Sequence, residues 1–220
     1  MHTGSGKSLC RMVRQNLEME PLSRESKNLL RSMKGSEMKN TFSVGDLTRI
    51  AIAAALISLC SWISIPAAVP FTLQTFAVFL VLSLLGGKNG TAAIAVYLLL
   101  GAVGVPVFAG FTGGLGILLG NTGGYLLGFL LTGISYWCVT ARLGKSKWAE
   151  SLALLLGLLL CYALGTLWFS VVYARANGAV GLGTILSWCV LPFILPDLAK
   201  LVLALTLSRR IAPALKKTGF

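Results

Sequence analysis

Six long apolar segments follow one another along this chain and decide what it can fold into. Short breaks rich in glycine, proline or basic residues separate them. The chain is 55% hydrophobic and only 12% charged, about half the charged share of a soluble domain. Because apolar runs of roughly 20 residues match a bilayer, the sequence predicts an all-α, polytopic protein with six transmembrane helices in the lipid bilayer, over approximately residues 46–65, 72–86, 90–105, 121–141, 150–174 and 183–207.

The second and third segments are short for a perpendicular crossing and are interrupted by glycines. Short, interrupted spans are typical of helices that break where they line a cavity. We therefore expect both segments to border an internal site.

Breaks that contain lysine or arginine alternate with breaks that contain few or none. Basic residues open the first segment, Lys88 lies between the second and third, and further basic residues follow the fourth and the sixth. The breaks over residues 66–71 and 106–120 have none, and the fifth break has only Arg175. Basic loops stay in the cytoplasm, so we expect a multi-pass plasma-membrane protein with cytoplasmic N- and C-termini. The net charge of +12 is thus explained by the orientation of the protein in the membrane, and we expect no nucleic-acid partner.

The first 42 residues are polar and mixed in charge, and Met38 would make a natural start. We expect residues 1–42 to be a disordered extension, without a signal peptide, and residues 43–220 to form the membrane domain.

The opening MHTGSGKS is similar to the tail of a phosphate-binding loop, but Met1 stands where the motif needs its first glycine. We expect no cofactor, and any ATPase that drives this protein must be another chain.

The sequence contains few of the residues that catalysis or metal binding would need. The one histidine is His2, and four of the five cysteines lie in apolar segments without close pairing, as free thiols do. An intramembrane enzyme would need a histidine or a second membrane carboxylate. We expect no metal site and no enzymatic activity.

Asp197 and Lys200 lie within the sixth apolar segment. Each costs about 2.5–3.5 kcal/mol at a membrane-helix centre on insertion scales, whereas a leucine contributes only about 0.3–0.6 kcal/mol. Their i, i+3 spacing puts both on one helix face, which must face protein or water. Intramembrane ionisable residues mark functional sites; the alternative is a structural pair that neutralises itself.

Pro196 adjoins this pair and cannot donate to the carbonyl of Pro192. We expect the helix to be interrupted there, with free amides and a positive dipole end near Asp197 and Lys200. An ammonium and a helix N-terminus suit a carboxylate, and a carboxylate acceptor suits N–H donors. The pattern predicts a small ligand with a carboxylate and an amide- or urea-like group.

Two further stretches have both a functional and an ordinary interpretation. PVFAGFTGGLGILLGNTGG, which contains Gly113, is rich in glycine and uncharged, and is either a flexible outer loop or a wall or lid over a ligand. Ala51 and Ala55 have the small-xxx-small spacing that permits close helix–helix approach, either inside the protein or with a partner.

From about Thr41 onward the chain resembles the BioY family, the biotin-binding S components of energy-coupling factor (ECF) transporters. The resemblance lies in VPFTLQTFAVFL (69–80), YLLLGAVGVPVFAGFTGGLGILLGNTGGYLLGF (97–129) and LPDLAK (195–200). It implies a six-helix, non-catalytic subunit for biotin uptake, energised by a transmembrane coupling subunit and two cytoplasmic ATPases. Ala51 and Ala55 fall where the resemblance implies contact with the coupling subunit.

The resemblance also implies site residues. The segment with Asp197 and Lys200 supplies polar ligand contacts in such proteins, and Thr112 stands where relatives carry Asn or Ser near the ligand. Gln74, Tyr125 and Gly113 lie in matching motifs and complete the predicted substrate-binding set. The alternatives are an S component for another vitamin and a non-catalytic membrane scaffold, which would bind no ligand saturably.

Overall fold

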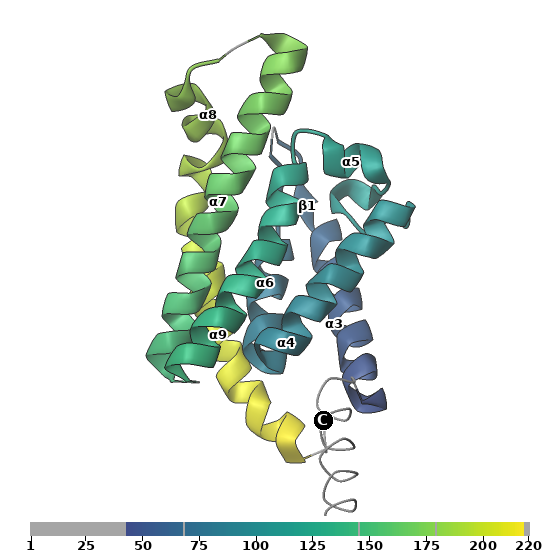
Figure 1. Cartoon of the computed structure of the whole chain (residues 1–220), viewed down its shortest axis with the longest axis vertical. Helices are drawn as coiled ribbons and strands as arrows, with labels where there is room; N and C mark the ends of the chain where they lie inside the picture. The colour runs from purple at the N-terminus through teal and green to yellow at the C-terminus, as the bar shows by residue number, and fades with distance from the viewer. Residues whose placement is uncertain (1–42, 68, 145, 179, 218–220) are drawn as a thin grey trace, which may run out of the picture. The chain divides into compact units, whose positions relative to one another are not determined.

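The computed structural model describes residues 43–67, 69–144, 146–178 and 180–217, so the predicted extension over residues 1–42 lies outside it. From Val44 onward the chain is a bundle of α-helices with one short antiparallel ribbon (Figure 1). Its elements are α3 (Val44–Trp62), β1 (Ser64–Ile65), β2 (Phe71–Thr72), α4 (Gln74–Val103), the 3-10 helix η1 (Ala109–Phe111), α5 (Leu115–Leu119), α6 (Gly123–Leu143), α7 (Lys147–Asn177), α8 (Leu182–Cys189) and α9 (Leu191–Lys217).

Within this described part, five helical stretches are long and apolar enough to cross a membrane: α3, α4, α6, α7, and α8 taken together with α9. The predicted all-α, polytopic membrane fold is therefore confirmed. Local sequence sets several of the boundaries. The Ser146 hydroxyl caps α7 by accepting from the backbone N–H of Ala149 at 3.1 Å, and Gly104 ends α4 in the left-handed conformation, with a φ of 110°.

Helix α4 contains the second and third predicted segments. In a straight helix Gln74 and Tyr97 would lie about 35 Å apart, yet the Gln74 Nε2 donates to the Tyr97 hydroxyl at 2.8 Å. The chain reverses at Gly86, whose φ of 78° and ψ of 177° suit glycine. The two arms of α4, before and after Gly86, lie side by side. Whether each arm crosses the membrane separately is not shown by the fold, so the count of six crossings remains a prediction. The sequence predicted that the helix would break where it lines a cavity. The break at Gly86 is instead a hairpin turn, because Gly86 is not among the residues that line the cavity described below.

The last apolar segment is interrupted earlier than expected. Val190, with a φ of −125° and a ψ of −55°, separates α8 from α9, and Pro196 lies inside the continuous α9. The amides of Phe193 and Ile194 both donate to the Val190 carbonyl. The prediction of a helix break at Pro196 with free amides beside Asp197 is therefore wrong. Pro192, in the first turn, occupies the position that tolerates a missing N–H.

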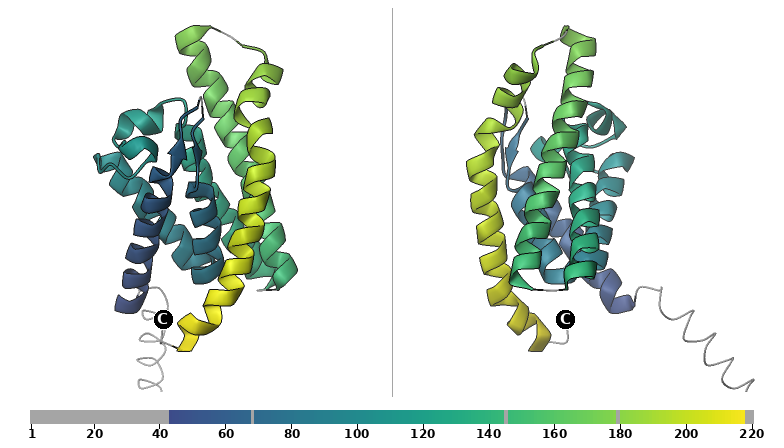
Figure 2. Two further views of the ribbon diagram at one scale, coloured as in Figure 1. Left: turned by 180° about the vertical axis from the view of Figure 1, so that it is seen from behind. Right: turned by 60° about the vertical axis from the view of Figure 1, so that its left-hand side comes forward.

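Glycines let α6 and α7 pack closely. A Cβ on Gly165 of α7 would lie 2.2 Å from the Tyr125 ring, and one on Gly128 of α6 would lie 2.7 Å from the Cys161 Sγ. Small residues permit such close approach between helices in a membrane. The contact places Tyr125 and Cys161 together beside the cavity, while α9 runs along α4 and α7 (Figure 2).

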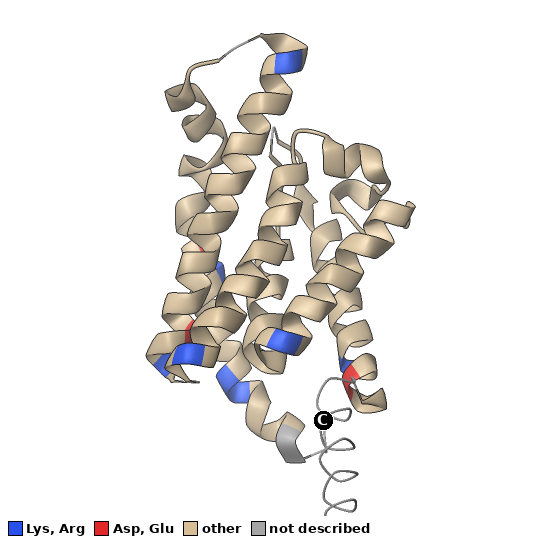
Figure 3. Ribbon diagram, viewed as in Figure 1, with Lys and Arg blue, Asp and Glu red and all other residues tan. Residues whose placement is uncertain are grey.

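Charged residues are distributed unevenly along the bundle. Figure 3 shows most of the Lys and Arg at the end where α3 begins and α9 ends, and basic colouring also at the opposite end, where α7 finishes; Lys200 lies between them, within α9. Arg175 lies in that last turn of α7. This segregation agrees with the alternation of basic and uncharged breaks, while the cytoplasmic placement of the basic end remains a prediction.

Candidate ligand-binding site

A cavity of about 280 Å³ opens among the β1–β2 ribbon, the 104–122 connection and helices α4, α6, α7, α8 and α9. Its lining is mostly apolar, as in small-molecule sites generally. Aliphatic and aromatic side chains supply most of the walls: Val69, Pro70, Phe108, Ile117, Leu126, Phe129, Leu158 and Phe193. Asp197 and Lys200 are the charged residues among those that line it.

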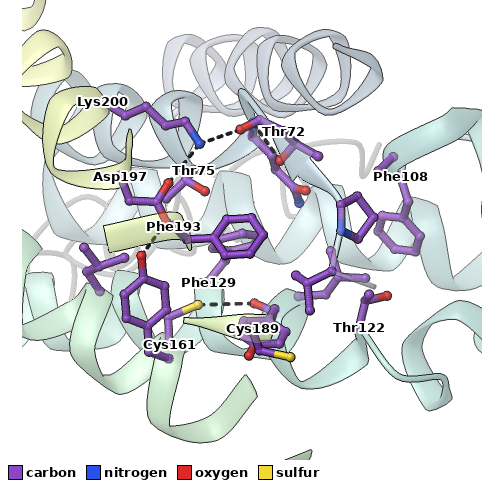
Figure 4. A pocket seen from close by; sticks show the side chains of 18 of the residues that line it. Thr72, Thr75, Phe108, Thr122, Phe129, Cys161, Cys189, Phe193, Asp197 and Lys200 are labelled. Atoms are coloured by element: carbon purple, nitrogen blue, oxygen red, sulfur yellow. Dashed lines mark hydrogen bonds and ion pairs between the residues drawn. The ribbon is translucent and has the colours of Figure 1, made fainter. Parts of the chain in front are cut away.

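The Asp197–Lys200 pair lies at one side of the cavity (Figure 4). The Lys200 Nζ is 2.8 Å from the Asp197 Oδ1 and donates to the Thr72 carbonyl at 2.7 Å. It also lies 4.1 Å from the centre of the Phe71 ring, within cation–π range. Asp197 is 3% exposed and Lys200 7%. A buried ammonium with an adjacent carboxylate is electrically compensated, so the pair forms a neutral but strongly polar surface.

Tyr162 of α7 binds the second oxygen of the Asp197 carboxylate. Its hydroxyl donates to the Asp197 Oδ2 at 2.7 Å, so both oxygens of the carboxylate are hydrogen-bonded. Tyr162 was not among the residues predicted from the sequence. The available signal was a tyrosine inside an apolar segment, where its hydroxyl must find a partner in the protein, but the sequence does not say which one. Thr72 was missed as well, because it contributes through its backbone carbonyl.

Five of the six predicted substrate-binding residues line this one cavity: Asp197, Lys200, Thr112, Gln74 and Tyr125. The Tyr125 hydroxyl lies 3.2 Å from that of Thr166. The Thr112 hydroxyl donates to the Ala109 carbonyl at 2.9 Å, so its proton is used within the loop. The geometry thus brings these residues together, while their contacts with a ligand remain a proposal.

Gly113 is placed differently. It is not among the cavity-lining residues, and a Cβ on it would lie 2.3 Å from the Val105 carbonyl oxygen. Gly113 therefore permits two backbone segments to approach closely, which is a structural role in shaping the loop. The next residue extends this contact, since the Gly114 amide donates to the Gly101 carbonyl at 2.7 Å.

The glycine-rich connection forms a wall of the cavity. Phe108, which is 1% exposed, lies under Gly101 and meets the Tyr97 ring edge-on with centroids 5.5 Å apart. Two indoles hold the connection from either side: the Trp62 Nε1 donates to the Pro106 carbonyl and the Trp168 Nε1 to the Gly120 carbonyl, each at 2.9 Å. These contacts favour the interpretation of the stretch as a cavity wall over that of a flexible outer loop.

Ala51 and Ala55 are both exposed on α3, whereas Ala54 and Ile57 on the same helix are buried. The pair lies on the outer face of the domain, away from the bundle interior. Within the described part of the chain, these two residues therefore do not pack against the bundle interior, and contact with a partner remains a proposal.

The cavity-lining thiols and the carboxylate do not gather into a metal site. Over the described ranges, no group of three or more histidine, cysteine, aspartate or glutamate side chains could hold a metal ion. Cys161 is buried, and its thiol donates to the Tyr125 carbonyl at 3.5 Å. Cys189 is also a buried free thiol.

Fold and site together define a class: a polytopic helical membrane protein with an internal cavity for a small, partly apolar ligand. Comparison with known sequences is more specific. The family model described as "BioY family" matches residues 35–217. The chain belongs to the BioY family, as its resemblance indicated.

Individual relatives agree. The chain is 42% identical over 168 residues to "Biotin transporter BioY" of Thermotoga maritima, covering 75% of this chain and 94% of that one. It is 39% identical over 167 residues to "Probable biotin transporter BioY" of Pyrococcus horikoshii, covering 76% and 95%. A crystal structure of the S-component for biotin from an ECF-type ABC transporter superposes with a TM-score of 0.68 at 30% identity, covering 76% of this chain and 90% of that one.

The Asp197–Lys200 pair makes a prediction about stability. Asp197→Leu or Lys200→Met alone leaves its partner as an uncompensated buried charge, and each is expected to destabilise the ligand-free protein by about 3–5 kcal/mol. The double variant removes both charges and is expected to be more stable than either single variant. Thermal unfolding in detergent measures this, and a double variant that loses the sum of the two single losses would contradict it.

Proposed function

We propose that this protein is the membrane-embedded substrate-binding subunit of a biotin uptake system, an S component energised by separate coupling and ATPase subunits. The observation that carries the proposal is the buried Asp197–Lys200 pair facing a largely apolar cavity. Membership of the BioY family, with relatives named as biotin transporters, supports the choice of ligand.

Biotin offers a ureido group with two N–H donors and one carbonyl acceptor, an apolar bicyclic body, and a carboxylate on an aliphatic chain. The Lys200 charge is already balanced by Asp197 at 2.8 Å, so a second anion on Lys200 would leave a net negative charge in a buried site. We therefore place the ureido group, not the carboxylate, at this pair. Lys200 donates to the ureido carbonyl, Asp197 accepts from an N–H, and Phe129 and Phe193 cover the apolar body.

The proposed orientation puts the basic end of the domain and both termini in the cytoplasm, with the cavity toward the outside. A transmembrane coupling subunit would then meet the exposed small residues of α3, Ala51 and Ala55. Two cytoplasmic ATPases complete the proposed assembly in the plasma membrane. In this scheme the chain binds and releases biotin without chemical change, so no catalytic residue is assigned.

Equilibrium binding of labelled biotin to the purified, detergent-solubilised protein tests the proposal. We expect saturable binding that unlabelled biotin displaces and other vitamins do not. Asp197→Asn and Lys200→Ala are expected to weaken binding by about ten- to a hundredfold, because each removes a charge-assisted hydrogen bond.

Unchanged affinity in both variants would contradict the role of the pair. Saturable binding of another vitamin in place of biotin would keep the transporter class and overturn the ligand. A folded protein that binds no vitamin would favour the scaffold alternative.

The coupling surface makes a separate prediction. In the double variant Ala51→Leu/Ala55→Leu, the larger side chains keep a partner helix from close approach. We expect association with the coupling subunit to weaken by about tenfold or more, while biotin affinity of the isolated protein stays within about twofold of wild type.

Co-purification from membranes that contain all subunits measures the association. Ala163→Leu is the matched control, because Ala163 is an exposed alanine on a different helix, α7. Loss of association in the control as well, or full association in the α3 variant, would contradict the assignment.

A further inference from the structure

Tyr162 of α7 borders the cavity, and its hydroxyl donates to the Asp197 Oδ2 at 2.7 Å. The proposed function uses Asp197 as the acceptor for a ligand N–H and assigns no role to Tyr162. We propose that Tyr162 is a positioning residue that fixes the Asp197 carboxylate toward the cavity and thereby sets the preference of this site for an N–H donor on the ligand. The inference rests on the proposed function of the same site and deepens it to ligand specificity.

The two charges of the ion pair are held from outside α9 by different parts of the chain. The Thr72 carbonyl accepts from the Lys200 Nζ at 2.7 Å, and the centre of the Phe71 ring lies 4.1 Å from the same nitrogen. Both groups belong to the strand β2. Tyr162 holds the carboxylate from α7. The ribbon therefore positions the ammonium, and α7 positions the carboxylate.

The Tyr162 hydroxyl opposes a rotation of the carboxylate. The torsion about the Cβ–Cγ bond of an aspartate is soft, and an adjacent ammonium attracts both carboxylate oxygens. Here Oδ1 lies 2.8 Å from the Lys200 Nζ, while Oδ2 accepts from Tyr162. Each oxygen of a carboxylate can accept two hydrogen bonds, so each retains room for one more donor. Because Asp197 lines the cavity, the ligand can supply that donor.

The direction of the Tyr162 hydrogen bond adds to the selection. The carboxylate that pairs with Lys200 only accepts, so the single phenolic proton is used at Asp197 and is not offered to the ligand. Tyr162 and Asp197 together therefore present acceptors to this side of the cavity. A ligand N–H is satisfied there, whereas a ligand oxygen would meet an acceptor without a proton between them, which costs free energy.

Two cyclic carbamate analogues of biotin, in which a ring oxygen replaces one or the other ureido N–H, probe this selection. The measured quantity is discrimination, the dissociation constant of each carbamate divided by that of biotin. The isomer whose ring oxygen faces Asp197 is identified with Asp197→Asn, because an asparagine amide can donate to that oxygen and should lower discrimination against that isomer.

Tyr162→Phe keeps the ring and removes the proton, so the carboxylate is free to turn toward Lys200 and away from the ligand. We expect discrimination against the isomer that faces Asp197 to fall by about tenfold. Discrimination against the other isomer should not change, because its ring oxygen lies away from the carboxylate.

A donor restored at the same place should restore the selection. Tyr162→p-aminophenylalanine puts an N–H donor at the para position, and we expect the wild-type ratios. Tyr162→p-fluorophenylalanine fills the space of the hydroxyl and donates nothing, so it keeps the test valid if Tyr162→Phe fails to fold.

Tyr173→Phe is the matched control. Tyr173 is a half-buried tyrosine on α7, as Tyr162 is, but it does not line the cavity. The substitution should change neither ratio.

A uniform loss of affinity for all three ligands would assign Tyr162 a purely structural role and overturn the inference. Unchanged ratios in Tyr162→Phe, or no recovery with the para-amino group, would overturn it as well. If Asp197→Asn lowers discrimination against neither isomer, the inference falls together with the role of Asp197. Failure of wild type to bind biotin would overturn the proposed function itself, so the two failures are distinguishable by the wild-type measurement.

Discussion

The ion pair between Asp197 and Lys200 is the interaction on which the rest of this structure depends. Two charges inside a membrane helix are stable only where other groups replace water. Here the Thr72 carbonyl and the Phe71 ring approach the ammonium, and the Tyr162 hydroxyl approaches the carboxylate. These groups come from the β1–β2 ribbon and from α7, so the pair requires two separate parts of the chain to converge on α9.

That convergence explains several features of the bundle. The reversal of α4 at Gly86 brings Gln74 and Tyr97 together. The close α6–α7 contact at Gly165 sets Tyr125 against the cavity. The glycine-rich connection, held by the indoles of Trp62 and Trp168, closes a further wall. The outcome is a pocket that is apolar over most of its surface and polar at the ion pair and Gln74, which suits a ligand whose polarity is concentrated in one group.

Much of this was accessible from the sequence. The apolar segments were recognisable because bilayer thickness fixes their length, and Asp197 and Lys200 stood out because charges there are costly. The groups that bind Asp197 and Lys200 could not be predicted from the sequence. Every residue has a backbone carbonyl, so nothing singled out that of Thr72, and Tyr162 has the appearance of any tyrosine in an apolar helix.

Proline was the misleading signal. Pro196 suggested a helix break, but a proline in the second turn costs one backbone hydrogen bond and can be accommodated. Pro192 is the residue that suits a helix start, and α9 begins beside it. Gly113 was ambiguous for a similar reason: a glycine in a loop beside a cavity can serve backbone approach as readily as ligand contact. The Val105 carbonyl, 2.3 Å from a Cβ placed on Gly113, supports backbone approach, and the sequence does not show that contact.

The most direct measurement is a structure of the protein with biotin bound, at a resolution that shows the orientation of the ligand. We expect the ureido carbonyl within about 3 Å of the Lys200 Nζ and a ureido N–H donating to Asp197, with the carboxylate away from the pair. A biotin carboxylate on Lys200, with the ureido group against the apolar wall, would contradict it.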